Sequence, residues 1–233
     1  MPAALPVVFA LYPDITQLDF TAPLEVLARL PGAAVRLASV AGGELSASGG
    51  LTFAHLERLD AVRECALLCV PGGFGTAQAM ADEAYLGHVA RLAAQSHYVT
   101  SVCTGSLLLG AAGLLKGRRA ACHWAFRELL TFFGAIPDEA RVVRDGNLFT
   151  GGGVTAGLDM ALTVAAEIAG RDFAEGLQLA LEYAPEPPFA AGRPEDAQPR
   201  VRAAVSQRFE VNWPERRAAA ARAATALAAR CRA

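Results

Sequence analysis

The sequence predicts an α/β fold: a doubly wound, mainly parallel sheet spanning residues 1–233 as a single domain. Short apolar runs alternate with stretches of helical periodicity, as in parallel strands joined by crossover helices. With 53% hydrophobic and only 19% charged residues, the chain can bury a sizeable core. One of the runs ends at Cys103, where a strand turns directly into a helix. The runs are residues 7–11, 35–40, 67–70 and 99–102.

The first half of the chain alternates between these runs and turn residues. After the first strand, a helix over residues 24–30 is expected to have Pro23 in its first turn and to stop at residues 31–32. Asp19 therefore lies in the loop between the first strand and the first helix, at the end of a parallel sheet where ligands bind. Considered alone, Asp19 is better explained as a helix-capping or turn carboxylate. The elements that follow are a strand at 35–40, a hairpin within 45–53, a strand at 67–70 and a helix over 77–94.

The second half is expected to complete the sheet. The Asp145-Gly146 pair predicts a hairpin over residues 141–150, because it suits the positive φ angles of a tight β-turn. His123 stands at a predicted helix start, where a histidine usually has a structural role. The other elements are a strand at 99–102, a helix at 107–115, a strand at 120–122, and helices at 123–133, 155–169 and up to 181.

The C-terminal region differs from the rest in composition. Residues 185–199 are rich in Pro, Ala and Gly and predict an ordered loop or linker. Residues 200–233 are basic and mostly helical, with a break at Pro214. They lack a helix-turn-helix pattern, so we expect a terminal extension that packs on the domain or on a dimer partner rather than an arm that binds DNA.

Composition excludes several classes of function. A formal net charge of −2 gives no attraction to nucleic acid or to an anionic membrane. The most apolar run, residues 107–115, is too short to span a bilayer, and residues 1–6 show no basic segment of a secretory signal. The five cysteines, including Cys231, are odd in number and lack the spacing of zinc ligands. We expect a cytoplasmic protein with no metal.

Cys103 is the leading candidate for a catalytic residue. It follows a β-branched strand and precedes the small residues Thr104, Gly105 and Ser106, which lead into a helix. Such a turn holds the sulfur near the first unpaired N–H groups of the helix, which favour the thiolate. A buried structural cysteine is the alternative. The flanking small residues favour the nucleophile.

A glycine-rich loop follows the strand at 67–70. Gly72 and Gly73 permit close approach of the backbone to a ligand, and their N–H groups can form an anion-binding nest, or else a plain turn. The spacing matches neither a dinucleotide fingerprint nor a P-loop. Because loops after parallel strands gather at one sheet edge, Asp19, this loop and Cys103 are expected to converge.

Together these motifs resemble the ThiJ/PfpI superfamily and, within it, the isocyanide (isonitrile) hydratases. The resemblance implies a flavodoxin-like fold, a homodimer, and a Cys103 nucleophile assisted by Asp19. Many superfamily members have a glutamate and a histidine where this chain has Asp19 and Thr104, which disfavours a Cys-His triad here. The matching segments are residues 18–26, Pro-Gly-Gly at 71–73, Ser-Val-Cys-Thr-Gly-Ser at 101–106, Ala-Gly-Leu-Leu at 112–115, His-Trp at 123–124 and residues 151–159.

The resemblance also implies a mechanism. The Cys103 thiolate attacks the terminal carbon of an isocyanide to give a thioimidate, and Asp19 donates a proton and then helps to activate water. Thr104 and the backbone N–H groups of Gly73 and Thr104 are candidates to assist the chemistry, and the Val154 carbonyl is a candidate to orient the thiol. No cofactor is needed. The expected pocket residues are Phe20, Phe74, Trp124 and Gly153.

Other functions remain open at this point. The same cysteine scaffold suits glyoxalase or deglycase chemistry on small aldehydes. It also suits a non-enzymatic ligand sensor, as in related transcription regulators, or a redox sensor based on an exposed low-pKa cysteine.

Overall fold

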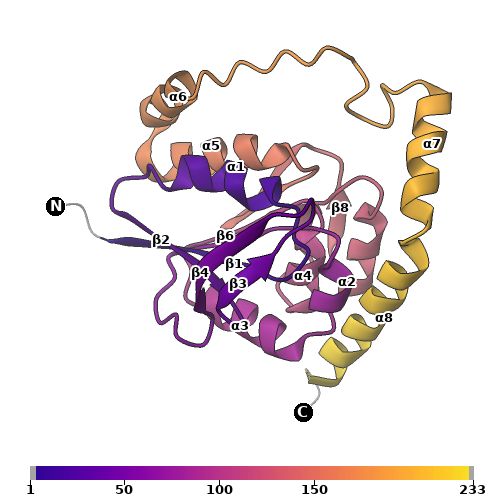
Figure 1. The fold of residues 1–233 in the computed structure, drawn as a ribbon, viewed down its shortest axis with the longest axis horizontal. Helices are drawn as coiled ribbons and strands as arrows, with labels where there is room; N and C mark the ends of the chain where they lie inside the picture. The colour runs from indigo at the N-terminus through magenta and orange to yellow at the C-terminus, as the bar shows by residue number, and fades with distance from the viewer. Residues whose placement is uncertain (1–3, 231–233) are drawn as a thin grey trace.

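The computed structural model describes residues 4–230, so the predictions made for residues 1–3 and for Cys231 lie outside the described part of the chain. An eight-stranded sheet has the order β3-β4-β2-β1-β5-β6-β10-β9 and is the centre of the fold (Figure 1). The strands are β1 (Leu5–Ala10), β2 (Ala33–Ser39), β3 (Gly43–Ser46), β4 (Thr52–Arg58), β5 (Leu67–Val70), β6 (Tyr98–Val102), β9 (Val142–Asp145) and β10 (Leu148–Gly151). A separate parallel pair joins β7 (Arg119–Ala121) to β8 (Ile136–Asp138).

Helices cover both faces of the sheet. On one face α1 (Leu18–Leu27) packs against α5 (Ala156–Ala169), which also contacts α6 (Arg171–Ala180). The other face carries α3 (Glu83–Ala93) and α4 (Gly105–Ala111), with α2 (Thr76–Ala79) and the 3₁₀ helix η1 (Arg127–Phe133) beside α4. The chain ends with α7 (Pro199–Glu210) and α8 (Trp213–Arg230), which Figure 1 draws in yellow along one side of the molecule.

The sheet confirms the predicted fold class. The neighbouring strands from β4 through β10 in the sheet order are parallel, and only the edge strands β3 and β9 run antiparallel. Because β2 lies on one side of β1 and β5 on the other, the strand order reverses between β1 and β5. In such sheets ligands bind outside the carboxyl ends of the strands at this reversal. The loops after β1, β5 and β6 end there.

The first helix starts earlier than the sequence predicts. It begins at Leu18, so Asp19 lies in its first turn instead of in a loop, and Pro23 lies inside the helix. Pro23 removes one backbone donor, but the turn before it is held by Thr21, whose N–H and hydroxyl both donate to the Gln17 carbonyl. The buried side chains on the same helix, including Val26, supply the packing that keeps it helical.

Two other elements differ from expectation. The helix predicted over residues 77–94 is split into α2 and α3, because Asp82 leaves the helical conformation and caps α3 by accepting the Tyr85 N–H at 3.0 Å. The helix predicted over residues 123–133 forms only from Arg127 onward, and as a 3₁₀ helix. Residues 119–121 form the predicted short strand, but they pair with β8 outside the main sheet.

The terminal segments lie differently on the molecule. Helix α8 buries Arg216, Ala219, Ala220 and Ala223 against the body of the fold, whereas no residue of α7 is buried. Small side chains permit the close approach of α8 to α2 and α4. Residues 181–198 cross the outside of the molecule between α6 and α7 without forming a helix or strand (Figure 1). No helix among residues 4–230 combines the length and apolar character needed to cross a bilayer.

Candidate active site

Cys103 lies at a sharp bend between β6 and α4. Its φ angle is +58°, in the left-handed region that non-glycine residues rarely adopt, and its N–H donates to the Gly151 carbonyl of β10 at 2.9 Å. The bend also needs Gly105, since a Cβ there would lie 2.2 Å from the Val70 carbonyl oxygen of β5. Backbone packing from two neighbouring strands therefore fixes the position of the sulfur, as in a nucleophile elbow.

Asp19 is brought to the same place by the first turn of α1. Its side chain is fully buried, and Oδ2 accepts the Gly72 N–H at 3.0 Å. The loop after β5 must hold glycine here, because a Cβ at Gly72 would lie 2.5 Å from the Thr104 nitrogen and 2.9 Å from Asp19 Oδ2. Within the described residues, Oδ1 is buried with no backbone or hydroxyl donor.

The protonation of this pair is set by burial. Burial raises the pKa of Asp19 to about 7, although the hydrogen bond from the Gly72 N–H and the neighbouring Cys103 thiol lower it. The pKa of Cys103 is raised well above its usual range by burial and then by the neighbouring Asp19, while the Thr104 N–H lowers it. We expected the helix start to favour a thiolate. Instead, burial outweighs that effect, and the resting sulfur is a thiol.

Thr104 connects the elbow to the glycine loop. Its Oγ1 accepts the Gly73 N–H at 3.1 Å and lies 2.8 Å from Thr76 Oγ1, which donates to the Gly73 carbonyl at 2.7 Å. The Gly73 N–H, a predicted donor to developing negative charge, is therefore already used inside the protein. The Thr104 N–H faces the sulfur instead.

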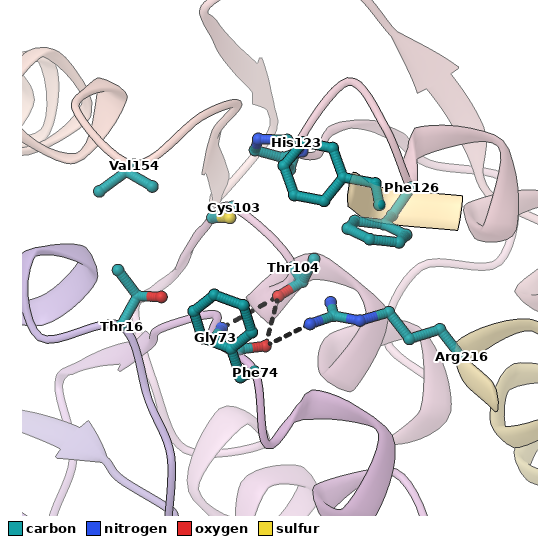
Figure 2. A pocket seen from close by; sticks show the side chains of 10 residues that line it. Thr16, Gly73, Phe74, Cys103, Thr104, His123, Phe126, Val154 and Arg216 are labelled. Atoms are coloured by element: carbon teal, nitrogen blue, oxygen red, sulfur yellow. Dashed lines mark hydrogen bonds between the residues drawn. The ribbon is translucent and has the colours of Figure 1, made fainter. Parts of the chain in front are cut away.

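An apolar cavity of about 200 Å³ opens beside Cys103 (Figure 2). Its volume suits a small organic molecule, and its surface is mostly aromatic and aliphatic. Figure 2 shows Phe126, Val154 and Phe74 around the sulfur, with Arg216 entering from α8. The lining residues are Thr16, Gly73, Phe74, Cys103, Thr104, His123, Phe126, Val154, Phe209 and Arg216.

The predicted pocket residues divide into three groups. Phe74 lines this cavity, as does Val154, which was expected to act through its backbone carbonyl. Phe20 does not: it is fully buried in the core and packs edge-on against Phe53, with ring centroids 4.8 Å apart, because the early start of α1 turns it towards the sheet. Trp124 and Gly153 line a second, more polar cavity of about 250 Å³, which shares only His123 and Val154 with the first.

His123 lies on the cavity wall, although a histidine at a predicted helix start was expected to have a structural role. Its Nδ1 accepts the Ala125 N–H at 3.3 Å, and its ring lies 5.1 Å from that of Phe209. Burial, and then the positive charge of Arg216, lower the pKa of His123 to about 4. A histidine with so low a pKa is a weak base, and no hydrogen bond joins it to Cys103 in the part of the chain that the structure describes.

Two further wall residues, Phe209 and Arg216, were not predicted. Phe209 and Arg216 come from the terminal helices, more than a hundred residues after Cys103 in the chain, and no local motif marks them. The only related prediction was that residues 200–233 pack on the domain or on a dimer partner. Within residues 4–230, no three His, Cys, Asp or Glu side chains come together as a metal site requires.

Comparison with known proteins agrees with this geometry. The sequence pattern of the DJ-1/PfpI family matches residues 6–167, which include all but the first residue of β1, together with β5, β6 and the elbow. The chain belongs to the DJ-1/PfpI family. This confirms the resemblance inferred from the motifs, and the matched residues contain Asp19, Gly72 and Cys103.

Several members of the family are similar over most of the chain. The isonitrile hydratase of Pseudomonas putida is 49% identical over 222 residues, covering 93% of this chain and 97% of that protein. A ThiJ/PfpI family protein from Pseudomonas syringae superposes with a TM-score of 0.88 at 40% identity, over 95% of this chain and 91% of that one. The HTH-type transcriptional regulator CdhR of Pseudomonas aeruginosa is 30% identical over 88% of this chain, which corresponds to 60% of the regulator.

Proposed function

We propose that this protein is a cofactor-independent isocyanide hydratase, which converts an isocyanide and water into an N-substituted formamide. The observation that carries the proposal is the buried pair of Cys103 and Asp19 beside a small apolar cavity. The pair joins a nucleophile to a carboxyl group whose pKa is about 7, so one group can both accept and return a proton near neutral pH. The high identity to an isonitrile hydratase over nearly the whole chain supports the same reaction.

The first half of the reaction forms a covalent intermediate. Asp19, as carboxylate, takes the proton of the Cys103 thiol while the sulfur attacks the terminal carbon of the isocyanide. The carbon–sulfur bond forms as electrons move onto carbon, and the protonated Asp19 delivers its proton there. The product is a neutral thioimidate, and Asp19 is again a carboxylate.

The second half consumes water. Asp19 takes a proton from a water molecule while the oxygen attacks the thioimidate carbon, and the protonated Asp19 then gives this proton to the nitrogen. As this adduct collapses, the carbon–sulfur bond breaks and the carbonyl forms; Asp19 takes the hydroxyl proton of the adduct and returns it to the sulfur, and the formamide is released. The Thr104 N–H, which faces the sulfur, stabilises the charge on the departing thiolate. Thr104 Oγ1 and Gly73 hold the glycine loop in place, and the Val154 carbonyl is a candidate to orient the thiol.

The test is formamide production from cyclohexyl isocyanide by the wild type, Cys103→Ala and Asp19→Asn. We expect turnover to be lost in Cys103→Ala and strongly reduced in Asp19→Asn. Cys65→Ala is the matched control, because Cys65 is also a buried free cysteine but does not line the cavity. An inactive wild type on several isocyanides would refute the proposal and favour the aldehyde chemistry.

We further propose that residues 1–233 form one domain and that the protein is a cytoplasmic homodimer. Support for a dimer comes from apolar side chains exposed along the C-terminal third: Leu179 is 82% exposed, Val211 79% and Phe189 78%. Exposed apolar surface of this kind is typical of protein interfaces. Light scattering coupled to size-exclusion chromatography measures the mass directly, and a monomer at micromolar concentration would contradict the dimer.

A further inference from the structure

Arg216 is an unusual residue for an apolar cavity wall. It is only 5% exposed, yet it belongs to the residue type that is least often buried without a charged partner. Arg216 lies on helix α8 and lines the cavity together with Phe126 and Phe209. Figure 2 shows its guanidinium pointing towards Gly73 and Thr104. Nothing in the mechanism above uses it.

The guanidinium is only partly satisfied by the protein. Nη2 donates to the Gly73 carbonyl at 3.0 Å, and the group lies over the Phe126 ring at 4.3 Å from its centroid. Nη1 is buried without any hydrogen-bond partner in the described part of the chain. Buried polar groups are nearly always hydrogen-bonded, so an unpaired charged donor in a cavity points to a ligand that supplies the acceptor.

The surrounding charges leave Arg216 without a counter-ion. Among residues 4–230 no carboxylate lies within 4.0 Å of it, since the neighbouring Glu215 is engaged outside the cavity with Gln78. Of the other titratable groups on the cavity wall, Cys103 is held as a thiol and His123 as a neutral ring. Within the described chain, Arg216 is therefore the one side chain lining the cavity that is ionised at neutral pH. The nearby Asp19 is buried outside the lining.

We infer that Arg216 determines substrate specificity, and that the preferred substrates are isocyanides whose substituent carries a carboxylate. This inference rests on the proposed function. The isocyano group is linear, so when its terminal carbon meets the Cys103 sulfur, the substituent extends away from the sulfur into the cavity. A carboxylate on a short substituent then forms an ion pair with the Arg216 guanidinium, which lines this cavity. An entirely apolar substituent leaves Nη1 unpaired and gains nothing from the charge.

The same geometry divides the pocket into an apolar part and a charged part. Aromatic and aliphatic side chains contact the carbon skeleton of the substituent, and the Arg216 guanidinium binds the carboxylate at its end. A site built to bond a polar group discriminates strongly against an analogue that lacks the group, because the protein donor is then buried and unsatisfied. Isobutyl isocyanide has nearly the shape of isocyanoacetate without its charge, and methyl isocyanoacetate keeps the acceptor oxygens but is neutral.

The experiment compares kcat/KM for these three isocyanides in the wild type, Arg216→Met, Arg216→Lys and Arg217→Met. We expect the wild type to prefer isocyanoacetate over isobutyl isocyanide, with the ester between them. Arg216→Met should reduce the isocyanoacetate-to-isobutyl ratio by about 10- to 100-fold, the range for loss of a hydrogen bond to a charged group. Arg216→Lys should retain part of the preference. Arg217→Met changes an exposed arginine of the same helix and should retain the wild-type ratio.

A binding measurement separates this inference from the proposed function. Calorimetry with N-formylglycine and N-isobutylformamide, the products expected from isocyanoacetate and isobutyl isocyanide, is carried out on Cys103→Ala protein with and without Arg216→Met. Tighter binding of N-formylglycine that depends on Arg216 supports the carboxylate site, even if no isocyanide is turned over by the wild type. An unchanged substrate ratio and unchanged binding in Arg216→Met would overturn the inference and leave Arg216 as a clamp on the Gly73 loop, whether or not the hydratase activity is found.

Discussion

The cavity beside Cys103 has two walls of different origin. One wall, the sheet-edge wall, consists of the loops after β1, β5 and β6. In these loops Gly72 and Gly105 lie so close to neighbouring atoms that even a methyl side chain would not fit. The other wall, the terminal-helix wall, is formed by side chains from α7 and α8, chiefly Phe209 and Arg216. Backbone packing fixes positions to a fraction of an ångström, whereas side-chain packing adapts to substitution. The first wall is thus suited to chemistry and the second to selecting the substrate.

The largest expected effect lies on the sheet-edge wall. Cys103→Ala should reduce kcat by at least about 10³-fold, as removal of a covalent nucleophile does in other enzymes, and should leave the melting temperature close to that of the wild type. Rapid mixing with an isocyanide followed by mass spectrometry should detect a thioimidate adduct on the wild type only. Turnover that persisted in Cys103→Ala would mean that Cys103 is not the nucleophile.

Backbone packing at the elbow gives the next prediction. Gly105→Ala should lower the free energy of unfolding by about 3 kcal/mol or more, because the new Cβ must displace the Val70 carbonyl. Denaturant unfolding measures this difference. Gly87→Ala is the matched control, since Gly87 lies in α3 with no atom near its missing Cβ, and should stabilise the protein by about 0.5–1 kcal/mol. Equal effects of the two changes would mean that the elbow is not rigid.

The buried carboxyl predicts a pH dependence with a definite sign. The pKa of Asp19 is raised from 3.8 to about 7 in the folded protein, so the folded state binds more protons than the unfolded state in this interval, and stability is lost as the pH rises through it. Asp19→Asn removes this loss. Its free energy of unfolding relative to the wild type should increase by about 2–3 kcal/mol between pH 5 and pH 8. A pH-independent difference would show that Asp19 is not buried in this way.

The same ionisation should govern catalysis. In the proposed reaction the carboxylate accepts the thiol proton, so kcat/KM should rise with pH through about 7 and level off above it. A pH–rate profile of the wild type measures this directly. A decrease of kcat/KM above pH 7 would instead mean that the protonated carboxyl begins the reaction.

The smallest expected effect lies on the terminal-helix wall. Phe209 packs against the rings of His123 and Phe126, with centroids 5.1 and 5.5 Å away. Phe209→Ala should raise KM for cyclohexyl isocyanide about 3- to 10-fold and change kcat little, because it removes contact with the substituent and leaves the reacting atoms in place. Steady-state kinetics separate the two constants. A loss of kcat as large as that of Asp19→Asn would abolish the distinction between the walls.

Much of the sheet-edge wall could be predicted from the sequence. The apolar runs and their turn residues placed β1, β5 and β6 in one parallel sheet, and the reversal of strand order then requires their following loops to meet. The convergence of Asp19, the Gly72–Gly73 loop and Cys103 follows from local patterns, because strand periodicity and glycine turns are properties of short segments. The exact start of α1 did not follow, since burial of Phe20 and Val26 extended the helix over Pro23.

What only the tertiary structure decided is the content of the other wall and the charge state of the site. Phe20 belongs to the core, Trp124 and Gly153 belong to a neighbouring cavity, and Arg216 enters the cavity beside Cys103 from a segment with no motif of its own. Burial, which depends on every element packed around a residue, raises the pKa values of Asp19 and Cys103 against the trend expected for a helix start. The sequence by itself determined which backbone segments converge. Their long-range packing decided which side chains face the substrate and in which protonation state.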